Sequence, residues 1–310
     1  MEFSHKSVLL DECIDALAIR PDGIYLDGTL GGAGHSYEIV QRLTTGRLIG
    51  VDRDRIALAA AGKRLEAFSE RVTTVHSNFC EIEAILDSLG LDGIDGMLFD
   101  LGVSSPQLDD AERGFSYMAD APLDMRMNKD DAMTAADVVN TWSQEELRRI
   151  LYEFGEERYA PQIASAIVRR REQKEIETTL ELVDIIRSAM PAQALREKQH
   201  PAKRSFQAIR IAVNDELGSV DKMMQAAIRR LNKGGRLAVI TFHSLEDRIV
   251  KNAMQAASKG CTCPPEFPVC ICGKKPLVKL ISRKPIVSGA KELEENPRAR
   301  SAKLRVCEKL

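Results

Sequence analysis

Apolar segments alternate with helix-like segments through the first hundred residues, and this alternation restricts the fold more than any other feature. Four apolar segments are predicted strands, at residues 23–30, 47–52, 71–77 and 94–102. The residues between them space their apolar side chains as helices do, for example in the Ala-rich segment 54–67. Strands that alternate with helices are typical of a parallel, doubly wound sheet with right-handed crossovers. We therefore predict an α/β fold.

The alternation stops after residue 102, because the next strong strand pattern is "RLAVITF" at 236–242. One crossover helix is too short for this interval. Two sequences inside it, "SQEE" at 143–146 and "TTLE" at 178–181, resemble helix capping boxes. We predict that residues 105–210 form an inserted helical domain.

The remaining segments, 1–104 and 211–310, are predicted to form one discontinuous sheet domain. After the fifth strand the sequence indicates a helix at 244–258 and two more strands, at 276–282 and 302–309. We expect a seven-stranded sheet whose last two strands are antiparallel.

The composition argues against a membrane protein and against a disulfide scaffold. Hydrophobic residues make up 44% of the chain, which is enough for a buried core. Its apolar runs, such as residues 237–242, are far shorter than the roughly 20 residues that cross a bilayer. The first residues lack the pattern of an export signal, and seven cysteines are an odd number. We expect a cytoplasmic protein with no membrane partner.

Positive charge is concentrated in two parts of a chain whose net charge is only -2. Residues 259–310 contain twelve Lys and Arg against five Glu, and residues 196–210 form a second basic segment. Such segments offer phosphate contacts to a nucleic acid, or they are solvated surface. Charge alone does not decide between the two.

A glycine-rich loop, residues 28–34, follows the first predicted strand, where ligands bind in open parallel sheets. A dinucleotide-binding loop would read G-x-G-x-x-G. Here the alternate positions after the strand are Thr29, Gly31 and Ala33, a pattern that favours S-adenosylmethionine. The carboxylate of that cofactor would be received by the backbone N–H groups of Ala33, Gly34 and His35.

Three more residues follow strand ends. Asp52 ends the second strand and is placed to accept the ribose hydroxyls, Phe79 follows the third and would stack on adenine, and Asp100 ends the fourth over the cofactor. Taken singly, each has an ordinary explanation: the glycines shape a turn, Asp52 caps a helix and Phe79 lies in the core. Their occurrence at successive strand ends favours a cofactor site.

Longer motifs resemble one family closely and in order along nearly the whole chain. They are "HKSVLLDE" (5–12), "DGTLGGAGHS" (27–36), "FDLGVSSPQLD" (99–109), "RGFSYMADAPLDMRM" (113–127), "HPAKRSFQAIRIAVNDEL" (200–217), "FHSLEDRIVK" (242–251) and "NPRARSAKLRV" (296–306). The chain resembles the MraW/RsmH family of bacterial methyltransferases, which act on N4 of a cytosine in the decoding region of 16S ribosomal RNA.

This resemblance implies a class I S-adenosylmethionine-dependent methyltransferase with a Rossmann-like seven-stranded sheet and an inserted all-α domain, residues 105–210, that recognises the substrate. It implies 16S rRNA within the small ribosomal subunit as partner, and it is compatible with a homodimer. Its cofactor positions fall on Ala33 to His35, Asp52, Phe79, Asp100 and Gln107. Ala33 stands where the family pattern has a further glycine, so the local loop geometry is open.

Transfer to an exocyclic cytosine amine requires oxygen acceptors, because the amine lone pair is delocalised into the ring. Candidate acceptors are the side chains of Asp100, Ser104 and Ser105 and the carbonyl groups before Pro106. Alternatively, Ser-Ser-Pro only shapes the turn and Asp100 binds cofactor alone. No covalent cysteine is needed for attack by N4.

Substrate contacts are less specific in the sequence. His243 either lines the target pocket or belongs to a helix cap made by Ser244 and Asp247. Candidates for phosphate contacts and base stacking are Arg113, Phe115, Arg204, Phe206 and Arg210.

Four cysteines, Cys261, Cys263, Cys270 and Cys272, form the pattern C-x-C, six residues, C-x-C. Four thiolates this close are suited to tetrahedral zinc, but the spacing departs from the usual C-x2-C knuckle and the resemblance implies no metal. A reduced or redox-sensitive loop is the alternative, and we assign no metal from the sequence.

Two other functions remain open at this level. One is a methyltransferase for a small molecule or a protein side chain, against which the basic segments argue. The other is a non-catalytic RNA-binding assembly factor that retains a methyltransferase fold.

Overall fold

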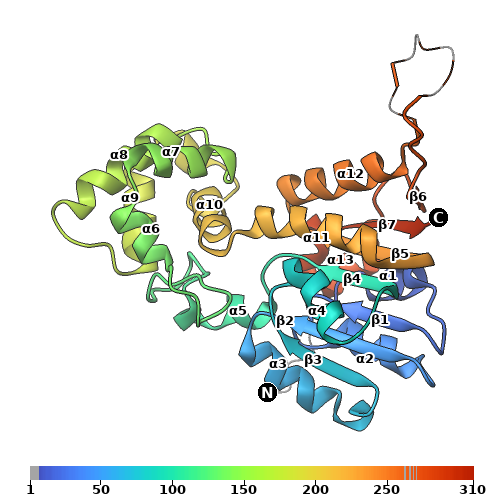
Figure 1. Ribbon diagram of the computed structural model, residues 1–310. Coiled ribbons are helices and arrows are strands. Elements are labelled where there is room, and N and C mark those ends of the chain that lie inside the picture. Colours follow the sequence, from blue (N-terminus) through green and yellow to red (C-terminus); the bar gives the residue numbers. More distant parts are fainter. Residues whose placement is uncertain (1–6, 262, 265–266, 268, 270) are drawn as a thin grey trace. The chain divides into compact units, whose positions relative to one another are not determined.

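The chain forms two compact units in a computed structural model, which describes residues 7–261, 263–264, 267, 269 and 271–310 (Figure 1). The sheet unit comprises Met1–Gly102 and Leu217–Leu310, and the helical unit comprises Val103–Glu216. No helix among the described residues is long and apolar enough to cross a membrane.

The sheet unit is built on seven strands in the order β3-β2-β1-β4-β5-β7-β6. The strands are β1 (Ile24–Asp27), β2 (Arg47–Asp52), β3 (Val72–His76), β4 (Ile94–Asp100), β5 (Leu231–Thr241), β6 (Val278–Leu280) and β7 (Lys303–Lys309). The first five run parallel, and β7 is antiparallel to both β5 and β6. The predicted α/β class and the antiparallel end of the sheet are confirmed.

Helices cover both faces of this sheet. They are α1 (Leu10–Leu17), α2 (Gly34–Gln41), α3 (Arg55–Arg64), α4 (Ile82–Ser88), α11 (Glu216–Arg230), α12 (Ser244–Ser258) and α13 (Ala290–Glu295), with 3-10 turns η1 (Glu66–Phe68), η2 (Phe79–Glu81) and η5 (Pro297–Ser301). Successive strand residues point to opposite faces. Leu26 and Met97 therefore pack with α4, α11 and α12, whereas Tyr25 and Leu98 pack with α1 and α2.

Two strands differ from their predicted extents by three residues or more at one end. β1 ends at Asp27 instead of residue 30, because the chain turns away there and Leu30 N–H donates to the Val51 carbonyl at 3.0 Å. β5 begins at Leu231 instead of 236, where its pairing with β4 contains an irregularity between Ile94 and Gly96. Apolar patterning locates a buried strand but does not mark where the ladder starts or stops.

The helical unit has its own hydrophobic core. Its elements are α5 (Ser105–Asp109), η3 (Ala111–Arg113), α6 (Ala135–Thr141), α7 (Gln144–Glu153), α8 (Ala160–Arg171), α9 (Thr179–Ala189), η4 (Ala194–Arg196) and α10 (Lys203–Asn214). Both predicted capping boxes are present: Ser143 with Glu146 begins α7, and Thr178 with Glu181 begins α9. Each satisfies backbone donors that a helix start would otherwise leave unpaired.

A buried asparagine fixes the loop before α6. Asn214, the last residue of α10, accepts a hydrogen bond from Met127 N–H at 2.8 Å. Its amide nitrogen donates to the carbonyls of Met125 and Arg210 at 2.8 and 2.9 Å. One side chain therefore satisfies two backbone groups of a buried loop, which local hydrogen bonding alone does not supply.

We predict that Asn214→Ala destabilises the helical unit by about 2–4 kcal/mol, because it leaves buried backbone groups of Met125 and Met127 without partners. The measurement is urea unfolding followed by fluorescence of Trp142, the single tryptophan of the chain, which packs against the core of the helical unit. Asn128→Ala is the control: among the described residues the side chain of Asn128 bonds within its own turn, so this variant should lose about 1 kcal/mol or less. Equal losses for the two variants would contradict the assignment.

Candidate cofactor site at the carboxyl ends of β1, β2 and β4

The strand order reverses between β1 and β4. From β1 the chain continues outward through β2 and β3, whereas β4 and β5 lie on the other side of β1. Loops at the carboxyl ends of two such strands leave in opposite directions and create a crevice between them. The glycine-rich loop after β1 begins at this point of the sheet.

Hydrogen bonds connect this loop to both neighbouring strands. Gly28 N–H donates to the Leu98 carbonyl of β4 at 2.9 Å. The Thr29 hydroxyl accepts from the Asp100 amide at 2.6 Å. A Cβ on Gly28 would lie 2.1 Å from the Phe99 ring, so only glycine allows the loop to pass so close to β4.

Asp52, at the end of β2, holds the other side of the loop. Its two carboxylate oxygens accept hydrogen bonds from Gly31 N–H and Asp54 N–H, both at 2.8 Å. Burial is the main cause that raises the pKa of Asp52 to about 6. A carboxylate has about four acceptor positions, so Asp52 keeps capacity for further donors such as the two hydroxyls of a ribose.

Asp27, at the end of β1, is a buried carboxyl that accepts hydrogen bonds from the loop and from α2. It accepts from the Ser36 hydroxyl at 2.7 Å and from Thr29 N–H at 3.1 Å. Burial raises the pKa of Asp27, and the hydrogen bonds from Ser36 and Thr29 oppose that rise. Its oxygens are engaged with the loop and with α2, which indicates a structural role.

Asp100, at the end of β4, is a third carboxyl whose pKa is strongly raised. Burial, followed by the negative charges of Asp27 and Glu246, raises the pKa of Asp100 to about 8. Its Oδ1 is buried and has no hydrogen-bond partner among the residues that the structure describes. A buried acceptor without a donor is unfavourable, so this oxygen is suited to a cationic or hydrogen-bonding ligand.

The loop ends at α2 with an unusual backbone. Ala33 is the N-cap of α2 and has φ 56°, a left-handed conformation that favours glycine. Its N–H donates to the Leu30 carbonyl at 2.7 Å, so it closes the turn. Contact of Ala33, Gly34 and His35 with the cofactor carboxylate stays a prediction.

His35 and Phe79 are placed by packing. The buried ring of His35 is 3.0 Å from the Val8 carbonyl through Nε2, which connects α2 to the segment before α1. Phe79 begins η2 and meets the Phe99 ring edge-on, with 6.0 Å between ring centroids. Phe79 is half-buried, so stacking on adenine stays a prediction.

His243 is the N-cap of α12, directly after β5. Glu246 accepts from His243 N–H at 3.3 Å, and the ring Nε2 of His243 is 3.0 Å from its other oxygen. The helix cap is therefore made by His243 and Glu246. The alternative cap through Ser244 and Asp247 is wrong, because Asp247 instead pairs with Arg305 at 2.6 Å.

The other predicted contact residues lie in the helical unit. Ser104 is the N-cap of α5 and accepts from Gln107 N–H, while Gln107 accepts from Ser104 N–H at 3.0 Å. This capping box is the observed role of both residues. Ser105 begins α5, and its side chain lies outside the described set.

Three predicted substrate residues are part of the fold of the helical unit. Arg113 is 3% exposed and donates to the carbonyls of Arg126 and Met127. Phe115 and Phe206 are buried in the hydrophobic core. Arg113 is therefore not available to phosphates, and the rings of Phe115 and Phe206 are not available to bases. We correct these three predictions. Residue types that suit RNA contacts can equally well lie in a protein core.

The two remaining arginines differ from each other. Arg204 lies near the surface and donates to the Glu156 carbonyl at 3.0 Å, so it remains a candidate for phosphate contact. Arg210 forms a two-pronged ion pair with buried Glu216, at 2.8 and 2.9 Å, and serves the fold.

Sequence reasoning missed several contributors. The sequence placed Thr29 and Gly31 in the glycine-rich loop, but it did not predict their hydrogen bonds to Asp100 and Asp52, which depend on how distant strands pair. Tyr117 and His200, which are 83 positions apart, stack at 4.6 Å with both rings half-buried. The signal for that pair was the presence of both residues in the long family motifs.

The seven-stranded sheet with antiparallel β7, and the acidic residues at the ends of β1, β2 and β4, define a class I methyltransferase. A model of the MraW methylase family matches residues 2–310. The chain is 57% identical to the "Ribosomal RNA small subunit methyltransferase H" proteins of Lachnospira eligens and Heliobacterium mobile, and the alignments cover 100% of this chain and 99% and 100% of those proteins. This chain belongs to the MraW methylase family.

The methyl donor of this enzyme class is S-adenosylmethionine, and the strand ends fit it. The unpartnered Asp100 Oδ1 suits the cationic part of the cofactor. Asp52 retains acceptor capacity for ribose, and a side chain at Gly32 would meet nothing within 4 Å, so the outer side of the loop is open.

We predict that Thr29→Val weakens binding of S-adenosylhomocysteine about tenfold, because the loop loses its bond to the Asp100 amide, on the order of 1.4 kcal/mol. Isothermal titration calorimetry measures the change. Thr44→Val is the matched control, since the Thr44 hydroxyl is exposed in another loop. Unchanged affinity for the Thr29 variant would show that this bond does not shape the site.

Proposed function

We propose that this chain transfers the methyl group of S-adenosylmethionine to the exocyclic N4 amine of cytosine 1402 in 16S rRNA. The observation that carries the proposal is the match along the entire chain to relatives of the same length that are named for small-subunit ribosomal RNA. We further propose that the enzyme acts in the cytoplasm on rRNA within the small subunit.

The charge distribution supports a nucleic-acid substrate. In the helical unit Arg196, Lys198 and Lys203 are exposed, and the half-buried pair Tyr117 and His200 belongs to the same unit. Basic side chains next to aromatic rings are typical of proteins that bind single-stranded RNA. We propose that the helical unit recognises the rRNA through these residues and Arg204.

The carboxyl at Asp100 is the candidate for the chemical step. When bound, S-adenosylmethionine supplies an electrophilic methyl group on a positively charged sulfur. The cytosine amine becomes cationic as it attacks, and then loses a proton. The buried carboxylate of Asp100 would favour that developing positive charge, and the released proton would pass to water.

Asp52 and the loop have a positioning task. By holding Gly31 and accepting the ribose hydroxyls, Asp52 would orient the nucleoside half of the cofactor. Ser104 and Ser105 follow Asp100 in the chain and stay candidate acceptors for N4.

The test is methyl transfer from labelled S-adenosylmethionine to small subunits isolated from cells that lack the modification. We expect label in N4-methylcytidine after digestion to nucleosides, and a loss of at least about 100-fold with Asp100→Asn. Failure of transfer while S-adenosylhomocysteine still binds would overturn the rRNA substrate. Full transfer by the variant would remove Asp100 from the mechanism.

Binding of S-adenosylhomocysteine should depend on pH through Asp100. Because its pKa is raised to about 8, Asp100 is mainly protonated at neutral pH, whereas the cationic amino group of the ligand favours the carboxylate. Binding then releases a proton, and affinity rises from about pH 6.5 to about pH 8 by up to ~10-fold per unit.

Calorimetry in two buffers of different ionisation enthalpy measures both the affinity and the released proton. Asp100→Asn should remove the dependence over this range. Asp92→Asn, an exposed carboxyl before β4, should keep it. A flat profile for the unmodified chain would contradict the assignment.

A further inference from the structure

A cysteine-rich loop connects α12 to β6 in the sheet unit. It leaves α12 after Ser258 and returns at Val278, and Leu277 N–H donates to the Ala257 carbonyl at 2.8 Å where the loop closes. None of the described residues of this loop takes part in the cofactor site above. Its cysteines therefore need a separate explanation.

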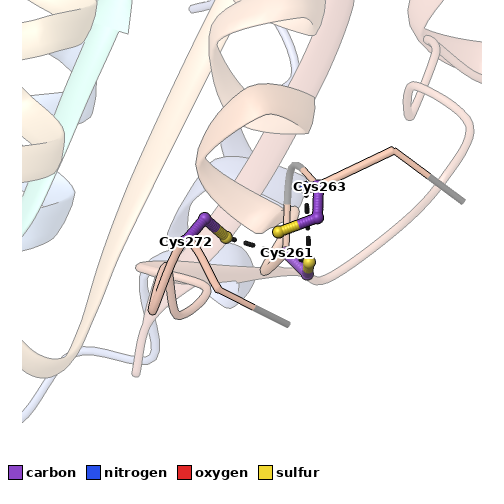
Figure 2. Close-up of side chains that lie close together, drawn as sticks. All are labelled: Cys261, Cys263 and Cys272. Carbon is purple, nitrogen blue, oxygen red and sulfur yellow. Dashed lines mark hydrogen bonds between the residues drawn. The ribbon is translucent and has the colours of Figure 1, made fainter. Parts of the chain in front are cut away.

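Three cysteines from the two sides of this loop lie together. The sulfur atoms of Cys261, Cys263 and Cys272 are all within 4.8 Å of one another, and their side chains turn toward a common centre (Figure 2). The sulfurs of Cys272 and Cys261 are 3.8 Å apart. Ligands about 2.3 Å from a tetrahedral zinc ion are about 3.8 Å from each other, so this separation suits a shared ion.

The backbone supports the thiolate form. Cys263 N–H donates to the Cys261 sulfur at 3.3 Å, a bond that favours a charged sulfur over a neutral thiol. Such N–H donors to ligating atoms orient metal ligands and tune their basicity. No disulfide joins any two cysteines within the described part of the chain.

The loop has little apolar packing to hold it. Phe267, Val269 and Ile271 are 47%, 70% and 75% exposed. A segment that cannot bury its apolar side chains is commonly ordered by a metal or a disulfide instead. Lys259, Lys274 and Lys275, all exposed, flank the cysteines and offset the negative charge of a thiolate cluster.

We propose that Cys261, Cys263 and Cys272 bind a structural zinc ion that fastens the loop between α12 and β6. Thiolates select soft and borderline ions, and zinc adds no redox chemistry to a chain that needs none for methyl transfer. The ion is bound far along the chain from Asp52 and Asp100, so the proposal does not depend on the cofactor or the substrate. Cys270 lies outside the described residues, and we test it separately as a fourth donor.

Metal content is the direct test. Full-length protein produced with zinc and then dialysed should retain about one equivalent by mass spectrometry, and Co2+ in its place should give thiolate charge-transfer absorption. The triple variant Cys261→Ser, Cys263→Ser, Cys272→Ser should fall below about a tenth of an equivalent. Cys80→Ser, in the same unit and outside the cluster, should keep full occupancy. Less than about a tenth of an equivalent in the unmodified protein overturns the proposal.

Trypsin cleavage tests the structural role without any substitution. Removing zinc with a chelator should speed cleavage at Lys259 and Lys274 by about tenfold or more, and adding zinc back should restore protection. Binding of S-adenosylhomocysteine should not change. Equal cleavage with and without zinc would refute a structural ion. If Cys270→Ser lowers zinc affinity further than Cys80→Ser, the site has a fourth thiolate; if both match the unmodified protein, three thiolates suffice.

Discussion

The hydrogen bond from the Asp100 amide to the Thr29 hydroxyl joins the two strands between which the sheet order reverses. Together with the hydrogen bond from Gly31 N–H to Asp52, this bond fixes the loop after β1 between β4 and β2. Parallel strands bring these carboxylates to one edge, and burial then raises their pKa values. A cofactor with both cationic and hydroxyl groups stabilises these buried carboxylates, whereas a phosphate would add further negative charge beside them.

The helical unit obeys different constraints. It has its own core, and buried polar groups such as Asn214 and the pair of Arg210 with Glu216 hold its loops. Most residues that the sequence suggested for RNA contacts instead stabilise the helical unit. Its surface keeps exposed Arg196, Lys198 and Lys203 and the half-buried pair of Tyr117 and His200, and such a local basic segment is suited to a polyanion without a deep pocket.

The cysteine loop shows a third way to order a chain. Hydrophobic burial organises the sheet and the helical core, whereas this loop leaves its large apolar side chains exposed. Convergence of three sulfur atoms there is explained by coordination more simply than by packing. Such a loop would remain ordered or unravel with metal supply, independently of the catalytic edge of the sheet.

The sequence by itself determined the α/β class, the interruption of the sheet, the capping boxes of α7 and α9, and Asp52 and Asp100 as strand-end carboxyls, because periodicity and capping are local properties. Only the tertiary structure decided that Arg113 and Phe115 are buried and that Thr29 meets Asp100. Those outcomes depend on which distant segments become neighbours. Residue type does not encode burial or partner, since one arginine serves equally for a carbonyl or a phosphate.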